Sequence, residues 1–161
     1  MKKIIALLLF ALCMSQVYAA ATSTSIQVTA TLSSTCSISA SNISFATIGI
    51  TTSNVTSSNS SLVVKCSNKL PYTIGFSSGN QGNNTMKGTN KNETIPYAMC
   101  QQEGWSLNGS NLICNNKSWI TSTMTGTGNG INQSYTVYGY VANGYYTPDN
   151  YTDSVTTTIW Y

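Results

Sequence analysis

Apolar and polar residues alternate in several short runs after residue 20. The clearest run is 25–33, in which Ile26, Val28, Ala30 and Leu32 occupy every second position. This spacing places all four side chains on one face of a β-strand. Apolar residues do not recur at the helical spacing of 3.6 after residue 20. The pattern therefore predicts an all-β chain.

The runs rich in Val, Ile, Thr and Tyr are separated by clusters of Asn, Gly, Ser and Pro. They predict strands at 26–32, 35–40, 43–48, 61–67, 72–77, 94–100, 134–141 and 151–161. Two turn-rich segments, 78–84 and 126–130, are expected to be exposed loops. Short strands joined by turns in one chain of this length predict a single β-sandwich.

The first residues have the pattern of an export signal. Lys2 and Lys3 precede an apolar run over 4–14, and small residues follow at the spacing of a cleavage site. The apolar run is too short to span a bilayer. We therefore expect a signal peptide at 1–19, with cleavage near Ala19 or Ala21.

Composition excludes much chemistry. The chain has 161 residues, and 63 of them are Ser, Thr or Asn; there is no His and no Arg. Without His there is no Ser-His or Cys-His nucleophile pair and no imidazole metal ligand, and without Arg bidentate recognition of guanine or phosphate is lost. After residue 20 five lysines face four acids. We expect no catalytic site, no metal, no cofactor and no nucleic acid partner.

The cysteines indicate an oxidising compartment. Removal of the signal peptide takes Cys13 away and leaves an even number, Cys36, Cys66, Cys100 and Cys114. Four cysteines allow three pairings. Their spacing suggests Cys36 with Cys66 and Cys100 with Cys114, without excluding the other two. A zinc site is disfavoured, because no CxxC pair and no His is present.

Two other functional classes were weighed. Glu93 and Glu103 could be regarded as a carboxylate pair for glycoside hydrolysis, but in polar sequence they are expected to be solvated surface residues. A secreted monomeric surface-coat or carbohydrate-binding protein is the alternative function. Its sugar-stacking candidates are aromatic residues that pack in the core of most sandwiches, namely Tyr138, Tyr140, Tyr145, Tyr146, Trp105, Trp119 and Trp160.

The two ends of the mature chain leave two hypotheses open. The run at 25–33 can be the first strand of its own sandwich or a strand for another molecule. The last predicted strand, 151–161, places Val155, Ile159 and Tyr161 on one face. A sandwich that stops on such a strand leaves an edge or a groove uncovered, and no covering element follows it in this sequence.

Four stretches carry a specific resemblance: VTATLSSTCSISASNISFATIG at 28–49, SLVVKCSNKLPYTIGFSSG at 61–79, YTVYGYVANG at 135–144 and YTDSVTTTIWY at 151–161. They resemble the spore coat U domain family, which includes the pilins of archaic (Csu-type) chaperone-usher pili. The best marks are Cys36, Cys66 and the Tyr-x-Asp of Tyr151 and Asp153. From Met86 to Asn129 the similarity is loose.

The resemblance implies an incomplete immunoglobulin-like β-sandwich at 34–161, completed by donor-strand complementation. The donor would be the N-terminal extension at 20–33 of another subunit. Its plug would consist of Ile26, Val28, Ala30 and Leu32, and the acceptor groove would be lined by Val155, Ile159 and Tyr161.

The family also implies a Cys36–Cys66 bridge. The expected partners are identical or homologous pilin subunits, a periplasmic chaperone and an outer-membrane usher. The expected location is a cell-surface fibre used in adhesion and biofilm formation.

Overall fold

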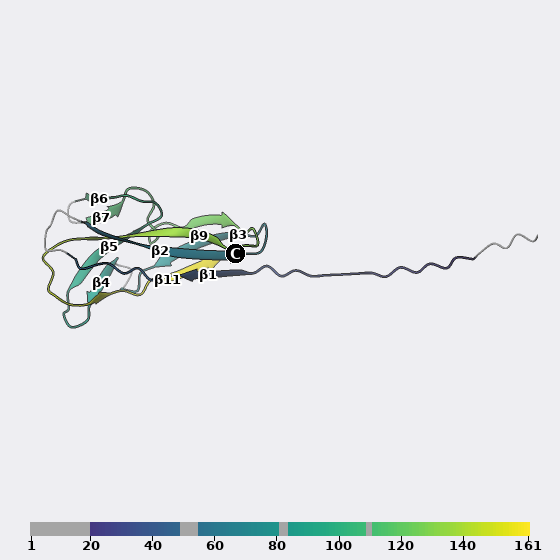
Figure 1. Ribbon diagram of the computed structural model, residues 1–161, viewed down its shortest axis with the longest axis horizontal. Helices are drawn as coiled ribbons and strands as arrows, with labels where there is room; N and C mark the ends of the chain where they lie inside the picture. The colour runs from purple at the N-terminus through teal and green to yellow at the C-terminus, as the bar shows by residue number, and fades with distance from the viewer. Residues whose placement is uncertain (1–19, 49–54, 81–83, 109–110) are drawn as a thin grey trace, which may run out of the picture. The chain divides into compact units, whose positions relative to one another are not determined.

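A computed structural model describes residues 20–48, 55–80, 84–108 and 111–161 (Figure 1). The expected signal peptide at 1–19 lies outside the described residues. Residues 20–32 and residues 33–161 belong to two separate units, and each unit is treated by itself. Among the described residues, no helix has the length and apolar character needed to cross a membrane.

The regular structure of residues 33–161 consists of strands. They are β1 (Cys36–Ala40), β2 (Val55–Cys66), β3 (Pro71–Ser77), β4 (Thr85–Gly88), β5 (Thr94–Cys100), β6 (Trp105–Asn108), β7 (Asn111–Cys114), β8 (Met124–Thr127), β9 (Gln133–Ala142), β10 (Tyr151–Thr152) and β11 (Thr156–Trp160). The part of the chain with assigned structure contains no helix. The predicted all-β class is therefore confirmed.

The strands form two main sheets and a hairpin, and every strand pair is antiparallel. One sheet has the order β1-β2-β9-β5-β4-β10, and the other has the order β11-β3-β8. The hairpin is β6-β7. Figure 1 shows β11 beside β1, so the edge strands of the two sheets are neighbours. This arrangement is the β-sandwich that the sequence predicts, and it is consistent with an immunoglobulin-like fold.

The core follows from the alternation of residues along the central strands. On β2, Leu62 and Val64 are fully buried, whereas Ser61 and Lys65 on the opposite face are exposed. On β9, Val137 and Val141 are buried on the same inner face. Ile74 of β3 meets them from the other sheet. Burial of these apolar side chains between the sheets is the main source of stability.

Two predicted strands are absent from the structure, and one is divided. Residues 26–32 and 43–48 have no strand assignment. A strand forms only where its backbone groups find a partner, and the alternation of apolar residues does not supply one. The predicted strand at 151–161 is split into β10 and β11, which belong to different sheets. The chain crosses from one sheet to the other between them.

Both suggested disulfides are present. Cys36–Cys66 joins the first residue of β1 to the last residue of β2, and these two residues are also directly paired in the sheet. Cys100–Cys114 joins the end of β5 to the end of β7 and thereby holds the hairpin against the sheet. The two pairings predicted from spacing are confirmed.

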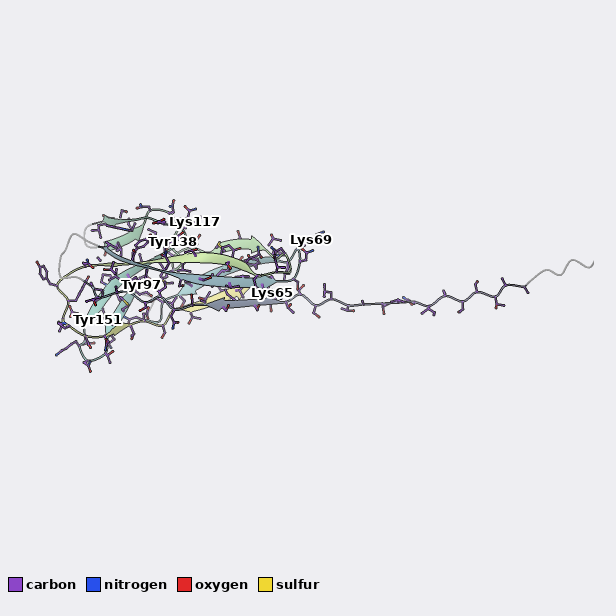
Figure 2. All side chains as sticks on the ribbon, in the orientation of Figure 1. Lys65, Lys69, Tyr97, Lys117, Tyr138 and Tyr151 are labelled. Carbon is purple, nitrogen blue, oxygen red and sulfur yellow. A yellow bond between two sulfur atoms is a disulfide. The ribbon has the colours of Figure 1, made fainter. Side chains whose placement is uncertain are left out.

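The lysines are distributed over the surface. Lys65 lies on β2, Lys69 lies in the turn before β3 and Lys117 follows the hairpin; all three side chains are exposed (Figure 2). Lys69 is in the left-handed backbone region, with φ 63°, which a lysine at a tight turn adopts at some energetic cost. The β2–β3 turn therefore brings β3 sharply from one sheet to the other.

Candidate partner-binding groove

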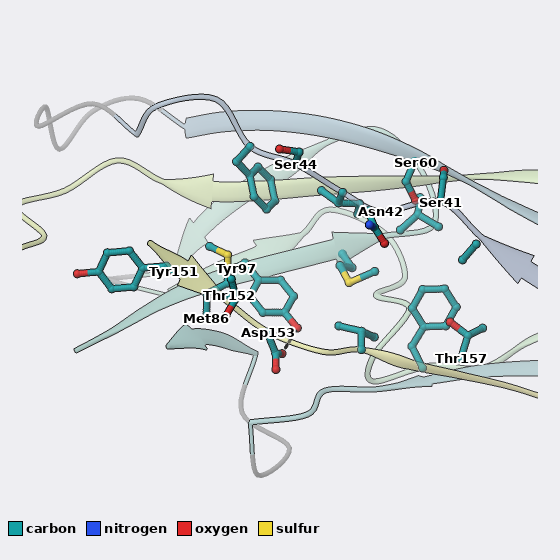
Figure 3. A pocket seen from close by; sticks show the side chains of 17 residues that line it. Ser41, Asn42, Ser44, Ser60, Met86, Tyr97, Tyr151, Thr152, Asp153 and Thr157 are labelled. Atoms are coloured by element: carbon teal, nitrogen blue, oxygen red, sulfur yellow. Dashed lines mark hydrogen bonds between the residues drawn. The ribbon is translucent and has the colours of Figure 1, made fainter. Parts of the chain in front are cut away.

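A groove lies between the edge strands of the two sheets. β1 pairs only with β2, and β11 pairs only with β3, so within the described ranges each has one unpaired edge. The groove has a volume of about 570 Å³. One wall is residues 40–45, and the other wall contains Val155 and Thr157 (Figure 3).

The floor of the groove is part of the hydrophobic core. It is formed by side chains from both sheets, namely Phe76, Met86, Tyr97, Met99 and Val137. A strand that enters the groove would therefore place its inward side chains directly on the core. Two unpaired strand edges above an apolar floor can accept both backbone hydrogen bonds and apolar side chains.

The segment 41–48, which follows β1 and contains most of this wall, contacts the rest of the domain in a different way from β1. Ser41 still bonds to β2, since its N–H donates to the Ser61 carbonyl at 2.9 Å. From 42 to 48 no backbone hydrogen bond joins the segment to any other described residue. Ile43 and Phe45 instead pack against the core as partly buried side chains. This wall is therefore fixed by side-chain packing.

Gly139 of β9 allows that wall to approach the sheet. A Cβ atom at this position would lie 3.0 Å from Cγ2 of Ile43 and 3.0 Å from Cζ of Phe45. Real Cβ atoms rarely come so close to a neighbour. The absence of a side chain at Gly139 is therefore what lets the segment at 41–48 lie against β9.

The three predicted groove residues lie in different surroundings. Val155 lines the groove, and Ile159 packs against the core beside it. Tyr161 is 61% exposed and does not line the groove. Thr157, which lies between Val155 and Ile159 on the same face, lines the groove and was missed from the sequence because its side chain is polar.

One carboxylate among the described residues, that of Asp153, lines the groove. Oδ2 of Asp153 accepts hydrogen bonds from the Tyr97 hydroxyl at 2.6 Å and from the Ser78 hydroxyl at 2.8 Å, and Oδ1 accepts one from the Ser154 N–H at 2.8 Å. Figure 3 shows Asp153 and Tyr97 facing each other in the groove. Burial, followed by the hydrogen bond to Asp153, raises the pKa of Tyr97. Tyr97 therefore remains a hydrogen-bond donor throughout the ordinary pH range.

Residues 20–32 form the other candidate partner-binding element. They have no strand assignment, and their side chains are exposed. Ile26, Val28 and Leu32 are 85%, 88% and 90% exposed, and Ala30 is exposed as well. Three large apolar side chains in water on one alternating face are unusual for a soluble chain and indicate a surface that binds a partner.

Two of the remaining acids hold loops together. The carboxylate of Glu93 accepts hydrogen bonds from the Thr147 N–H at 2.8 Å and the Tyr151 hydroxyl at 2.9 Å, and hydrogen bonding to Thr147 and then Tyr151 lowers its pKa. Glu103 is exposed. The role of Glu93 is therefore explained by the structure of the loop before β10.

Asp149 has a similar role. Desolvation opposes its ionisation, but hydrogen bonds from the Asn90 side chain and from the backbone N–H groups of Asn90, Lys91 and Asn150 lower its pKa to about 2. The carboxylate thus ties the turn after β4 to the segment that leads into β10.

The aromatic candidates for sugar stacking do not share one environment. Trp119 is 1% exposed and stacks on Phe76, with ring centroids 4.9 Å apart. Tyr140 is also buried, whereas Tyr145 lies in an exposed loop. Trp160 packs across Gly75 on the outer face of β3. The two buried rings cannot stack on a sugar. Tyr138 and Tyr146 are partly buried against the core, whereas Trp105, Tyr145 and Trp160 are exposed.

All four cysteines of the described chain are in disulfides, and no group of three or more potential metal-ligating side chains occurs in those residues. The groove with its apolar floor and the exposed apolar row of the extension are each suited to protein–protein contact.

Two solved structures contain chains that are similar to this protein. A chain in the crystal structure of the CsuC–CsuE chaperone–tip adhesion subunit pre-assembly complex, from the archaic chaperone-usher Csu pili of Acinetobacter baumannii, superimposes with a TM-score of 0.56 at 18% sequence identity, over 81% of this chain and 41% of that chain. A chain from a chaperone–tip adhesin complex of CFA/I fimbriae biogenesis gives a TM-score of 0.46 at 10% identity, over 76% and 40%.

This protein thus spans about two fifths of the length of each structural neighbour. No curated protein matches it. The sequence pattern of the Spore Coat Protein U domain matches residues 22–158, a range that includes the extension and both walls of the groove. On this match the chain belongs to the Spore Coat Protein U domain family.

Proposed function

We propose that this protein is a structural pilin subunit of an archaic chaperone-usher pilus and polymerises by donor-strand exchange. One observation carries the proposal. The same chain contains an exposed extension with alternating apolar residues and a groove between two unpaired strand edges. In a polymer, Ile26, Val28, Ala30 and Leu32 of one subunit occupy the groove of the next.

The energy of this contact is large compared with the stability of a domain. Burial of Ile, Val and Leu side chains contributes roughly 1.5 to 3 kcal/mol each, so the four donor residues contribute about 5 to 10 kcal/mol before any backbone hydrogen bonds. The total stability of a typical domain is about 5 to 15 kcal/mol. The high exposure of the three large side chains means that almost all of this area is available for burial on assembly.

The same features suggest the assembly partners. A subunit with an open groove and unpaired strand edges is prone to aggregate, so it needs a periplasmic chaperone until an outer-membrane usher exchanges the chaperone for another subunit. The description of the Csu neighbour as a chaperone–subunit complex supports a chaperone as a partner. Donor and acceptor are different surfaces of one chain, so the contact is head to tail and extends into a fibre.

The fibre is placed on the cell surface after export through the periplasm, with a role in adhesion and biofilm formation. The test is to shear cells that carry the native gene cluster and to run the released protein on a denaturing gel, unboiled and boiled. We expect a ladder of subunit multiples that collapses on boiling, with fibres in the electron microscope. A single monomer band in both lanes, without fibres, would favour the secreted monomeric binding protein instead.

A further inference from the structure

Among the described residues, the groove lining contains one charged side chain, that of Asp153. Asp153 lies in the crossing between β10 and β11, and its carboxylate is bonded to Tyr97 of the larger sheet and to Ser78, which follows β3 of the smaller sheet. Both of those hydroxyl residues are buried, at 5% and 7% exposure. Asp153 therefore joins the two sheets where the lining of the groove reaches the β10–β11 crossing.

Strand pairing shows the direction of β11 along the groove. Trp160 pairs with Thr73, close to the start of β3 and to Cys66, which is bonded to Cys36. Thr156 pairs with Ser77 at the far end of β3. β11 thus runs from the Asp153 side of the groove toward the Cys36 side.

Asp153 is the only charged residue among the described ones that line the groove, whose polar lining residues also include Ser41, Asn42, Ser44, Ser60 and Thr157. An apolar side chain pressed onto this carboxylate would remove water from the charge and offer no hydrogen bond in return. Such burial is strongly unfavourable.

The donor sequence has a matching boundary. The four apolar side chains from Ile26 to Leu32 lie on one face of the donor strand. The next residue on that face is Thr24 on the N-terminal side and Ser34 on the C-terminal side. β1 and β11 run in opposite directions along the groove, so a donor strand between them is antiparallel to one and parallel to the other. We take the donor to be antiparallel to β11, as β3 is on the other edge of β11. A donor antiparallel to β11 places Leu32 nearest to Asp153.

We propose that Asp153 fixes the register of the donor strand of a second copy of this chain, because a slip of two residues toward it would press Leu32 onto the carboxylate. The inference rests on the proposed function and adds to it. Alternation of apolar residues allows any slip of two residues, since the same face stays inward. The carboxylate excludes the slip toward the β10–β11 crossing, so Asp153 is a positioning residue for assembly.

Cysteine cross-linking in assembled fibres measures the register. Thr156→Cys on the exposed face of β11 is combined, one at a time, with Gln27→Cys, Thr29→Cys, Thr31→Cys or Ser33→Cys on the outward face of the donor. Only directly opposite residues bring their Cβ atoms near disulfide distance, and a neighbour two positions away does not. We expect one donor position to give a ladder that survives boiling without reductant, at least about tenfold above the others.

The same series in Asp153→Ala fibres tests the role of the carboxylate. We expect a second product of comparable yield at the donor position two residues nearer the N-terminus. Asp153→Asn keeps a hydrogen-bond acceptor for Tyr97 and Ser78 without the charge, and should give a smaller share of the same product. Glu103→Gln, which changes an exposed acid outside the groove, is the matched control and should leave the pattern unchanged.

A donor variant tests the idea with Asp153 intact. Leu32→Ser places a hydroxyl at the end of the apolar row, so the slipped product should appear in this variant too. An unchanged single product in Asp153→Ala or in Leu32→Ser would overturn the inference, as would several registers in the parent fibres. Absence of any cross-link together with absence of an unboiled ladder would instead refute the proposed function.

Discussion

Replacement of one donor residue by a charged one should stop polymerisation. Val28 is 88% exposed in the free chain and is expected to be buried in the groove of the next subunit. Val28→Asp removes about 1.5 to 3 kcal/mol of apolar burial. It also places an unpaired charge in the groove, which costs about 1 to 3 kcal/mol more.

The combined loss of at least about 2.5 kcal/mol weakens the subunit contact by a factor of about 60 or more. The acceptor groove of the variant is unchanged, so its capture by the chaperone should be unaffected. The measurement is the unboiled ladder from sheared cells, together with copurification of the subunit with the chaperone of the same gene cluster.

Thr29→Asp is the matched control. Thr29 is exposed and belongs to the opposite phase of the alternation, so its side chain faces away from the groove in the donor arrangement. This variant should form normal ladders. Normal fibres from Val28→Asp, or an equal loss in Thr29→Asp, would refute the reasoning that one face of this segment is a plug.

Three further perturbations test the domain itself. Loss of the Cys36–Cys66 bridge in a Cys36→Ser, Cys66→Ser variant should lower the periplasmic yield, since closure of a loop of this size contributes about 3.6 kcal/mol, and an unchanged yield would contradict this. The pKa of Asp149 is lowered to about 2, so its contribution to stability is complete above about pH 4 and is lost as the pH falls toward 2; Asp149→Asn should therefore flatten the acid dependence in urea unfolding, and an equally steep dependence would count against it. Gly139→Ala should displace Ile43 and destabilise the domain by about 1 to 3 kcal/mol in the same assay, and an unchanged stability would refute the close packing of 41–48 on β9.

The sequence predicts the central strands of the sandwich well because their residues alternate and their partners are within the same chain. β3, β5 and β9 appear near their expected ranges, whereas β2 begins six residues before the expected range of 61–67. Each of these strands presents one apolar face to the core, which is the pattern that marks it in the sequence. The spacing of the cysteines suggested the two disulfides that the structure contains, without excluding the other two pairings.

The strand that was wrongly predicted and the strands that were missed have a common physical cause. The segment at 43–48 has the alternation of a strand, with Ile43 and Phe45 inward, but its backbone finds no strand partner among the described residues. β4 and β8, four residues each, are too short to give a periodic signal. Pairing is a property of the assembled sheet, and a single run of residues does not contain that information.

The groove was only partly predictable. Val155 was found from the apolar pattern, but Thr157 and Asp153 line the groove as polar residues. Asp153 had been singled out as a mark of the family, without a position in the fold. Its role became visible only when the partners Tyr97 and Ser78 were seen to come from two different sheets.

The position of the Cys36–Cys66 disulfide has a mechanical consequence. When the N-terminal segment is pulled, the force enters the domain at Cys36, the first residue of an edge strand. Without the bridge, β1 would be peeled from β2 one hydrogen bond at a time. The covalent link passes the force directly to β2, which is paired on both sides and extends over twelve residues. Tension is thereby carried by many hydrogen bonds at once in the middle of the sheet, and the domain should resist stretching better than its exposed edge strand suggests.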